Sequence, residues 1–599
     1  MPGSVRVAAA QIEAGQDVTE NLAACLRVID AAAGQRAQLV VLPEFCNHLS
    51  WYASRTQAHE RATRPGDEFL TAIAERARRH GIWIKINLTL AHPDGTTGGT
   101  NFLFDPAGEV AGTCDKQTLM GAENDFLEPG ATVGPVLETP LGRIGMYACM
   151  EGVINEVARG LALRGAQVLL NSLNSFALDE ADLHIPVRAA ENKVWVVAAN
   201  KVGPLLPRDE LPAIAERLGV PPEWLHGAGE SQIVAPDGTV VAKAPRTGEA
   251  VVVADIDPTL ADDKRRPDGT DIFATRRPEL YGPIGEPPAG RRRPPGAPVL
   301  RSAVVRDPAL VRDAVDKGAK LVVMPESGGD PALLAAALDG TGAHVVTTAL
   351  EDGVPTGLLI SRDGIVARQP RLHGRSGDIG RSNEKGVAGT PGTSDTASTA
   401  STSGTASTAS TSGTASTSGT ASTSGTDSPD SPDSADSADS ADSADSADSA
   451  DSAEIVPIDL EWGRLAIIAG DDALYPETFR LAALLDTDVV AVPYDAQEDW
   501  ELALGLPERA AENRLNLVVA TPIDQPAAIL AMTPDFTLWT RWEGPFTGRI
   551  STPVRTDIPA GEASGAAEVA PAQAANRLVS RNTDLVDGRP WRLVDALTR

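Results

Sequence analysis

Cysteine is scarce in this chain: there are four among 599 residues, and no two of them form a C-x-x-C pair. This spacing predicts neither a zinc site nor a disulfide framework, and it fits a reducing compartment. No apolar run is long enough to cross a bilayer, and the first residues lack the charged and apolar regions of a secretory signal. We therefore expect a cytoplasmic protein with no membrane segment and no bound metal.

Basic residues are outnumbered, with 52 lysines and arginines against 82 acidic residues, which gives a formal net charge of −30. One tract contributes nine of the acidic charges, because an aspartate recurs at every third position from Asp427 to Asp451. Without these nine aspartates the charge is still −21. This excess of negative charge argues against a nucleic acid or an anionic membrane surface as partner.

Large apolar residues are almost missing from residues 388–453, which consist of Ser, Thr, Ala and Gly followed by Ser-Ala-Asp repeats. Burial of such residues cannot offset the conformational entropy that ordering costs, so we expect a disordered insertion. Its hydroxyl groups would suit phosphorylation. A solvated spacer, expanded by repeat slippage, is the interpretation that its composition favours.

Outside this insertion, short apolar strands alternate with amphipathic helices, the pattern of an α/β protein. Residues 39–42, 168–170 and 194–199 are continuous apolar runs typical of buried strands. Before the first run, Asp17-x-x-Glu20 has the spacing of a capping box, and it precedes an amphipathic segment with Cys25 on its apolar face. The length of the chain predicts more than one hydrophobic core.

An internal repeat is present. The segment Ala-Gln-Leu-Val-Val-Leu-Pro-Glu at 37–44 returns as Ala-Lys-Leu-Val-Val-Met-Pro-Glu at 319–326. The pentapeptide Arg-Ala-Ala-Glu-Asn occurs at 188–192 and again at 509–513. Repetition at this distance indicates two copies of one fold in tandem.

The spacing within the repeat brings two further positions into register. Cys149 precedes Arg188 by 39 positions, and Gly470 precedes Arg509 by the same 39. We therefore predict a first domain and a second, interrupted domain, with the insertion between its two parts. Their bounds are 4–288, 297–387 plus 454–599, and 388–453 for the insertion.

Three segments supply the parts that a thiol nucleophile needs. Cys149 stands where an apolar strand runs into a helix-forming segment, and the backbone N–H of Met150 could donate to an oxyanion. Glu44 ends a buried strand, where desolvation would raise its pKa toward that of a general base. Lys116 would place a cation beside the oxyanion and would favour the thiolate.

Each of these residues also has a structural interpretation. A cysteine after a strand is often a small buried hydrophobe, and an acid there often only begins a helix. A single lysine usually lies on the surface. On the residues alone, both interpretations stay open, because isolated titratable residues predict sites weakly.

The order of these segments resembles the nitrilase superfamily, the carbon–nitrogen hydrolases. The resemblance is carried by Leu-Pro-Glu-Phe ending at Phe45, Asp-Lys-Gln-Thr-Leu around Lys116 and the elbow that starts at Cys149, together with residues 188–192 and 229–238. It implies a four-layer α-β-β-α sandwich, present twice, and a mechanism without a cofactor. In that mechanism Glu44 is the base, Lys116 stabilises the tetrahedral intermediate, and Cys149 forms a thioester that water hydrolyses.

The resemblance also bears on Glu123 and on the substrate. Glu123 matches a second family glutamate that would orient the lysine or the substrate, although an ordinary loop acid is the alternative. The segment Cys-x-Glu-Gly is similar to Cys-x-Asp-Gly of aliphatic amidases, and Met150 stands where nitrilases tend to have tryptophan. We therefore expect a small amide or carbamoyl compound as substrate, with ammonia released.

Two alternatives stay open: a nitrilase or N-carbamoyl amino acid hydrolase, and a non-hydrolytic binding or assembly protein. The substrate-binding residues are not identified from the sequence. The segment 204–228 is longer than a simple connection needs and is a candidate wall of the pocket. His184 and His226 could contact a substrate, although a surface position is the preferred interpretation for both.

The second copy departs from the family pattern at two of three positions, since Glu326 is kept while Arg371 and Gly470 replace the lysine and the cysteine. The thioester route is therefore closed there. Asp471 and Asp472 could activate water, but we favour decay of the site with retention of the fold. Because family members pair through helices, the resemblance implies an intrachain pseudo-dimer, with a higher homo-oligomer as a further state.

Overall fold

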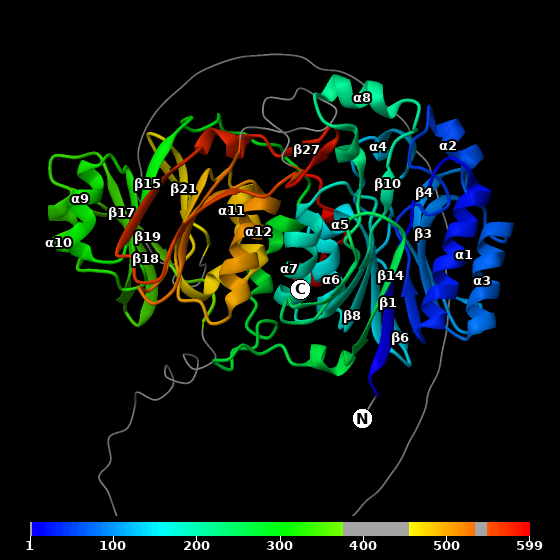
Figure 1. Cartoon of the computed structure of the whole chain (residues 1–599). Coiled ribbons are helices and arrows are strands. Elements are labelled where there is room, and N and C mark those ends of the chain that lie inside the picture. The colour runs from blue at the N-terminus through cyan, green and yellow to red at the C-terminus, as the bar shows by residue number, and fades with distance from the viewer. Residues whose placement is uncertain (1–2, 375–453, 534–547) are drawn as a thin grey trace, which may run out of the picture. The chain divides into compact units, whose positions relative to one another are not determined.

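The computed structural model describes residues 3–374, 454–533 and 548–599 (Figure 1). Within these ranges the chain forms four six-stranded sheets, two in each half, and two small two-stranded sheets. No helix among the described residues is long and apolar enough to span a membrane. The insertion at 388–453 lies outside the described residues, so its disorder stays a prediction.

The first half contains a sheet with the strand order β14-β1-β2-β3-β4-β5 and a sheet with the order β13-β12-β9-β8-β7-β6. Strands β1, β2 and β3 run parallel, as do β7, β8 and β9. The strands predicted at 39–42, 168–170 and 194–199 are confirmed as β2, β8 and β9. The bounds are β1 Val5–Gln11, β2 Leu39–Val41, β3 Trp83–Ala91, β4 Thr97–Phe104, β5 Val110–Asp115, β6 Val136–Thr139, β7 Gly142–Ala148, β8 Val168–Ser172, β9 Trp195–Ala199, β12 Gln232–Val234, β13 Val240–Lys243 and β14 Ala250–Ile256.

Helices cover the outer faces of both sheets of the first half. Helix α1 (Val18–Gly34) and helix α3 (Glu68–His80) pack on the first sheet, and α6 (Glu156–Leu163) and α7 (Ile185–Asn192) pack on the second. Between the two sheets, buried aliphatic side chains of β1, β2, β7, β8 and β9 form a further core. This arrangement is the predicted four-layer α-β-β-α sandwich.

Helix α1 begins as the sequence predicts. The Asp17 side chain accepts hydrogen bonds from the backbone N–H groups of Thr19 (2.8 Å) and Glu20 (3.1 Å), which the first turn of a helix leaves without partners. Cys25 lies on the buried face of this helix and is fully inaccessible. Its assignment to the core is confirmed.

The second half repeats this topology strand by strand. Its sheets have the orders β26-β15-β16-β17-β18-β19 and β25-β24-β23-β22-β21-β20, which match the two sheets of the first half position for position. The two copies of one fold are thus confirmed. The bounds are β15 Leu300–Val305, β16 Leu321–Val323, β17 His344–Glu351, β18 Val354–Ser361, β19 Gly364–Pro370, β20 Ile458–Leu460, β21 Gly463–Ile467, β22 Val489–Pro493, β23 Asn516–Ala520, β24 Ala527–Ala531, β25 Val554–Ile558, β26 Ser564–Val569, α9 Val311–Asp316, α10 Pro331–Ala337, α11 Pro476–Leu484 and α12 Leu506–Asn513.

Strained backbone positions recur at matching points of the two halves. Phe45 and Ser327, each after a Pro-Glu pair, have φ angles of 49° and 55°. Lys193 and Arg514, each after an Arg-Ala-Ala-Glu-Asn helix, have φ angles of 45° and 54°. Because a positive φ is unfavourable for residues other than glycine, its recurrence shows that the local geometry has been retained in both copies.

Each half places its C-terminal segment against the other half. After β14, Arg266 pairs with Glu501 (3.0 Å) and Asp471 (3.1 Å) of the second half. The C-terminal segment of the second half includes β27 (Leu578–Ser580), β28 (Thr583–Asp584) and α13 (Asp595–Thr598). Helix α13 contacts α6, and Figure 1 shows the C-terminus beside this helix.

Candidate active site

Glu44 lies just beyond the C-terminal end of β2 and is fully buried. Its backbone N–H donates to the carbonyl of Leu173, 3.1 Å away, which follows β8 of the second sheet. Burial raises the pKa of Glu44 to about 7, although the nearby charge of Lys116 opposes this change. A carboxyl group in this range can both accept and return a proton near neutral pH.

Lys116 follows β5 and lies between two carboxylates. Its Nζ atom is 2.8 Å from Oε1 of Glu44 and 2.8 Å from Oε2 of Glu123. Burial lowers the pKa of Lys116, but the charges of Glu123 and Glu44 outweigh it, and the net pKa lies well above its ordinary value. The lysine is therefore a fixed cation.

Glu123 is the first residue of α4 (Glu123–Phe126), and its side chain lies next to that of Lys116. Its Oε2 atom accepts hydrogen bonds from Nζ of Lys116 and from the backbone N–H of Met120, at 2.8 and 2.9 Å. The carboxylate thus joins the cation to the loop that precedes α4.

Cys149 separates β7 from α5 (Met150–Val153) with φ of 50° and ψ of −106°. Its backbone N–H donates to the carbonyl of Ser172 (2.9 Å) and to Oδ1 of Asn171 (3.0 Å), which hold this strained conformation. Strain of this kind persists only where the surrounding structure holds it, and it is common at functional sites.

The charge of Lys116 favours the thiolate of Cys149, as expected, but it is not the largest influence on this thiol. Burial and the charge of Glu44 raise the pKa of the Cys149 thiol well above its ordinary value, and Lys116 lowers it only in part. The thiol is therefore protonated at rest, and Lys116 does not produce a standing thiolate. Deprotonation must accompany the attack on a substrate, which requires a base.

The sequence alone did not identify Glu151 as a site residue. Its side chain connects the elbow at Cys149 to the segment that follows Lys116. Its two carboxylate oxygens accept the backbone N–H groups of Gln117 (2.6 Å) and Ala148 (2.7 Å). Burial raises the pKa of Glu151 to about 7. The Cys-x-Glu motif includes this residue, but only the structure reveals which backbone N–H groups its carboxylate accepts.

A cavity of about 110 Å³ contains Cys149 and Glu123. Leu205, Leu206 and Leu225 line it, so the segment 204–228 does reach the cavity, whereas Trp224 and His226 line a separate one. The described residues that line the first cavity are Ser50, Trp51, Met120, Gly121, Ala122, Glu123, Cys149, Asn174, Phe176, Leu205, Leu206, Leu225 and Ser580.

His184 is not the surface residue that the sequence suggested. It is buried, with Nδ1 2.8 Å from Oε2 of Glu508 and Nε2 3.0 Å from Oγ of Ser551, both in the second half. Burial lowers the pKa of His184, but Glu508 and Asp179 outweigh it, so the net pKa lies well above its ordinary value. No local sequence pattern could reveal this position, because the partners lie more than 300 residues away in the chain.

Arg188 ties the elbow segment to the second half. Its Nε atom donates to the carbonyl of Gly152 at 2.6 Å, in the short helix that follows Cys149. Its Nη2 atom donates to Oε2 of Glu512 at 2.6 Å and also to Glu508, both on α12. One buried guanidinium thus links the turn after Cys149 to the other copy.

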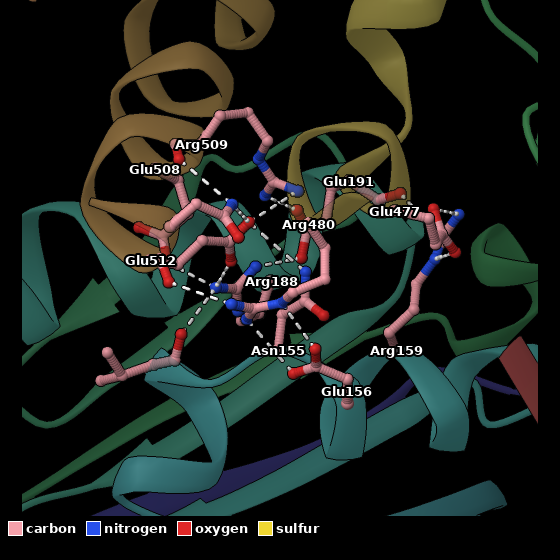
Figure 2. Close-up of polar contacts among 12 residues, drawn as sticks. Asn155, Glu156, Arg159, Arg188, Glu191, Glu477, Arg480, Glu508, Arg509 and Glu512 are labelled. Atoms are coloured by element: carbon pink, nitrogen blue, oxygen red, sulfur yellow. Dashed lines mark hydrogen bonds and ion pairs between the residues drawn. The ribbon is translucent and has the colours of Figure 1, made fainter. Parts of the chain in front are cut away.

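This link belongs to a larger network in which the arginines of each half meet glutamates of the other, as Figure 2 shows. Arg159 pairs with Glu477 at 3.0 Å, and its counterpart Arg480 pairs with Glu156 at 2.7 Å. All four side chains are buried. Buried charges are tolerated only when they are paired, so each half depends on the other for its charge balance.

The corresponding site of the second half is filled. Gly470 has φ of 57°, close to the 50° of Cys149, so the elbow conformation persists. A Cβ atom added at Gly470 would lie 2.6 Å from Oε1 of Glu326. The glutamate therefore occupies the space that a cysteine side chain would need.

The two aspartates beside Gly470 make structural contacts. Asp472 accepts the backbone N–H groups of Leu372 and His373, each at 2.8 Å. Asp471 pairs with Arg266 at 3.1 Å. These contacts support decay of the site with retention of the fold over activation of water.

Restoring a thiol at Gly470 is therefore expected to restore no activity. In a Cys149→Ala/Gly470→Cys variant, Arg371 still stands in place of the lysine, and the Glu326 carboxylate must move to admit the added side chain. Ammonia release should therefore stay at the level of Cys149→Ala alone. Gly353→Cys is the matched control, because Gly353 also has a positive φ but nothing lies within 4 Å of an added Cβ. This control should react readily with iodoacetamide, while recovery of about 1% of wild-type turnover by the double variant would contradict the expectation.

Comparison with known proteins places this fold and site in a family. The family model described as carbon-nitrogen hydrolase matches residues 6–266. A nitrilase from Pyrococcus abyssi is 33% identical over 264 residues, which are 44% of this chain and 93% of that protein. The chain therefore belongs to the carbon–nitrogen hydrolases, and it is a hydrolase acting on carbon–nitrogen bonds other than peptide bonds.

Two further relatives are amidases. The deaminated glutathione amidase of Mus musculus is 27% identical over 301 residues, 47% of this chain and 86% of that protein. The N-carbamoylputrescine amidase of Solanum lycopersicum is 27% identical over 298 residues, 46% of this chain and 93% of that protein. Both matches cover less than half of this chain, so they leave room for a complete second copy.

Proposed function

We propose that this chain hydrolyses a small amide or carbamoyl compound and releases ammonia, with Cys149 as nucleophile. The observation that carries the proposal is the buried ion-pair arrangement of Glu44, Lys116 and Glu123 around a strained cysteine that lines a cavity. Burying three ionisable groups in one place costs free energy. Their presence beside Cys149 therefore points to a functional site.

The first half-reaction begins when Glu44 takes the proton of the Cys149 thiol as sulfur attacks the carbonyl carbon. A carbon–sulfur bond forms, and the negative charge on oxygen is stabilised by the Lys116 ammonium and the backbone N–H of Met150. Glu44 then returns its proton to the leaving nitrogen. The carbon–nitrogen bond breaks, ammonia departs, and a thioester remains on Cys149.

The second half-reaction reuses the same groups. Glu44 takes a proton from water, whose oxygen attacks the thioester carbon, and the tetrahedral intermediate is again stabilised by Lys116. Collapse of this intermediate breaks the carbon–sulfur bond and returns the proton to the sulfur of Cys149. The products are a carboxylic acid, or a carbamic acid from a carbamoyl compound, and the original enzyme.

The size of the cavity and the relatives bear on the substrate class. A volume of about 110 Å³ beside Cys149 suits a short acyl group. Relatives that act on amides and on a carbamoyl compound support these two classes. Nitrile hydrolysis is a second candidate, because the relative with 33% identity is a nitrilase.

We also propose that the second half acts as an internal partner, so that one chain forms a pseudo-dimer. The support is the reciprocal set of buried arginine–glutamate pairs between α6 and α11 and between α7 and α12. Such pairs replace a subunit interface by contacts within one chain.

A test of the proposed function is ammonia release from a panel of short aliphatic amides, carbamoyl compounds and nitriles. We expect turnover of amides or carbamoyl compounds, and we expect nitriles to react more slowly. Turnover of nitriles alone would favour the second candidate. Absence of ammonia from the whole panel would contradict the proposed function.

The pH dependence should report the base. Because burial raises the pKa of Glu44 to about 7, its carboxylate is available above that pH and is lost by protonation below it. We expect kcat/KM to fall about 50-fold between pH 7 and pH 5. This acidic limb of the pH profile should have its apparent pKa near 7.

Glu151 is the matched control for this pH profile, because burial raises its pKa to about 7 as well. Its oxygens bind backbone N–H groups in place of a reacting group. The limb should therefore persist in Glu151→Gln. A profile that is flat from pH 5 to pH 8 in the wild type would contradict the role of Glu44.

A further inference from the structure

One wall of the cavity at Cys149 comes from the other copy of the fold. Ser580, the last residue of β27, is buried and lines this cavity, although it lies more than 400 residues beyond Cys149 in the chain. Among the residues that the structure describes, all others that line this cavity belong to the first half. The copy without a nucleophile thus reaches the site of the copy that has one.

The segment around Ser580 is fastened to the loop that precedes Glu123. Oγ1 of Thr583 accepts the backbone N–H of Gly121 at 2.8 Å and donates to the carbonyl of Leu119 at 3.2 Å. In the same loop, the backbone N–H of Met120 donates to the Glu123 carboxylate that binds Lys116. Thr583 therefore holds the loop on which the position of the ion pair depends.

Apolar side chains pack the segment around Ser580 against the elbow at Cys149. Val579 and Leu585 form a buried cluster with Met150, Val153 and Ile154, the residues directly after Cys149.

The loop and the hairpin also lie very close to each other. A Cβ atom added at Gly121 would lie 2.7 Å from Oγ of Ser580, and the positive φ of 52° at residue 121 also favours glycine. Arg581 adds an ion pair with Asp125 on α4. The hairpin formed by β27 and β28 thus contacts the elbow, the loop and α4.

We propose that this hairpin is part of the active site of the first half. Ser580 is a specificity-determining residue, and Thr583 is a positioning residue that acts through Glu123 and Lys116. This inference rests on the proposed amide hydrolysis. It also gives the second copy a reason to be kept after its own nucleophile was lost.

The chemistry of the cavity narrows the substrate class further. Most of the lining is apolar, from leucine side chains and the rings of Trp51 and Phe176, while Ser50 and Ser580 bring hydroxyl groups. This combination suits a short aliphatic acyl group that carries one polar substituent, such as a hydroxyl, which Ser580 can hydrogen-bond.

The test for Ser580 compares amides of equal size that differ in one polar group, using the full chain. The probes are 3-hydroxypropanamide with butanamide, and 2-hydroxypropanamide with 2-methylpropanamide. In Ser580→Ala, the ratio of kcat/KM between hydroxylated and apolar probes should fall about tenfold, because one hydrogen bond to the substrate is lost.

A second readout does not depend on turnover. Ser580→Leu fills part of the cavity and should slow alkylation of Cys149 by iodoacetamide about tenfold, measured by peptide mass spectrometry. Ser564→Leu is the matched control, because Ser564 also lies in the second half but is exposed on β26. It should leave both the probe ratio and the alkylation rate unchanged.

Thr583 is tested by a pair of substitutions. Thr583→Val removes both hydrogen bonds and should lower kcat about tenfold with little change in KM, because Lys116 is displaced relative to the oxyanion. Thr583→Ser keeps the hydroxyl and should recover most of kcat. A loss of folding alone would lower the amount of active enzyme, counted by alkylation of Cys149, and would leave kcat per active site unchanged.

The outcomes separate this inference from the proposed function. If the wild type hydrolyses the probes but Ser580→Ala keeps their ratio within twofold and Ser580→Leu keeps the alkylation rate, the inference is wrong while the proposed function stands. If the wild type releases no ammonia from any probe, the proposed function fails. In that case, unchanged alkylation of Cys149 in Ser580→Leu would also show that the hairpin does not wall the cavity.

Discussion

Replacing Cys149 by alanine is expected to reduce ammonia release from the preferred amide by at least about 10⁴-fold, because no other group can form the thioester. The substitution removes only the sulfur atom of the side chain. The backbone of residue 149 stays in place because Ser172 and Asn171 accept hydrogen bonds from its N–H. The variant should therefore fold normally and bind substrate. Initial rates with a coupled ammonia assay measure the effect.

Cys46→Ala is the matched control for this prediction. Cys46 is buried like Cys149 but has no exposed surface, and it follows the same strand as Glu44. It packs in the core beneath α1 and α3. Its loss leaves a small cavity that costs on the order of 1 kcal/mol of stability, with most of the activity retained. Comparable losses of activity in both variants would point to a shared structural effect and not to a nucleophile.

Arg188→Met should have the largest effect on stability. The substitution keeps much of the side-chain volume but removes the cation that faces Glu508, Glu512 and Glu191 in a buried setting. We expect the free energy of unfolding to fall by about 3–5 kcal/mol, because carboxylates that lose a buried partner are left without compensation. Activity should fall as well, since the carbonyl of Gly152 in the elbow segment loses its donor.

Urea unfolding followed by tryptophan fluorescence measures this loss as a shift of the midpoint. The control is Arg312→Met, which breaks an ion pair with Asp316 whose two side chains are 51% and 56% exposed. Exposed pairs contribute little, so its midpoint should change by less than the equivalent of about 1 kcal/mol. Equal shifts in both variants would show that the buried network has no special role.

Much of the fold could be predicted because the relevant signals are local. Continuous apolar runs identified β2, β8 and β9, and the repeated pentapeptide at 188–192 and 509–513 aligned the two copies without adjustment. The resemblance to the carbon–nitrogen hydrolases assigned Glu44 and Lys116 to one site. The structure places their side chains 2.8 Å apart.

The remaining features depend on contacts between distant parts of the chain. Ser580 and Thr583 sit in a short segment with no motif, and only the packing of the second half on the first brings them to the cavity. His184 seemed to be a surface residue because its partners Glu508 and Ser551 lie in the other copy. Residue patterns record local periodicity, and they do not record which distant side chain neutralises a buried charge.

The state of the cysteine also needed the structure. Lys116 was expected to favour the thiolate and does lower the pKa of Cys149, but burial and the charge of Glu44 have the larger effect on this pKa. This result strengthens the requirement for a base. It also predicts that mutation of Glu44, and not only of Cys149, blocks the first chemical step.

The most direct test of the account is the covalent state of Cys149 during turnover. The wild type is mixed with its best amide, quenched in acid within milliseconds to seconds, digested and measured by mass spectrometry. We predict that the peptide containing Cys149 gains the mass of the acyl group, while the peptides containing Cys25, Cys46 and Cys114 do not. Full turnover with no acyl group on Cys149 at any quench time, together with an active Cys149→Ala variant, would contradict the central claim.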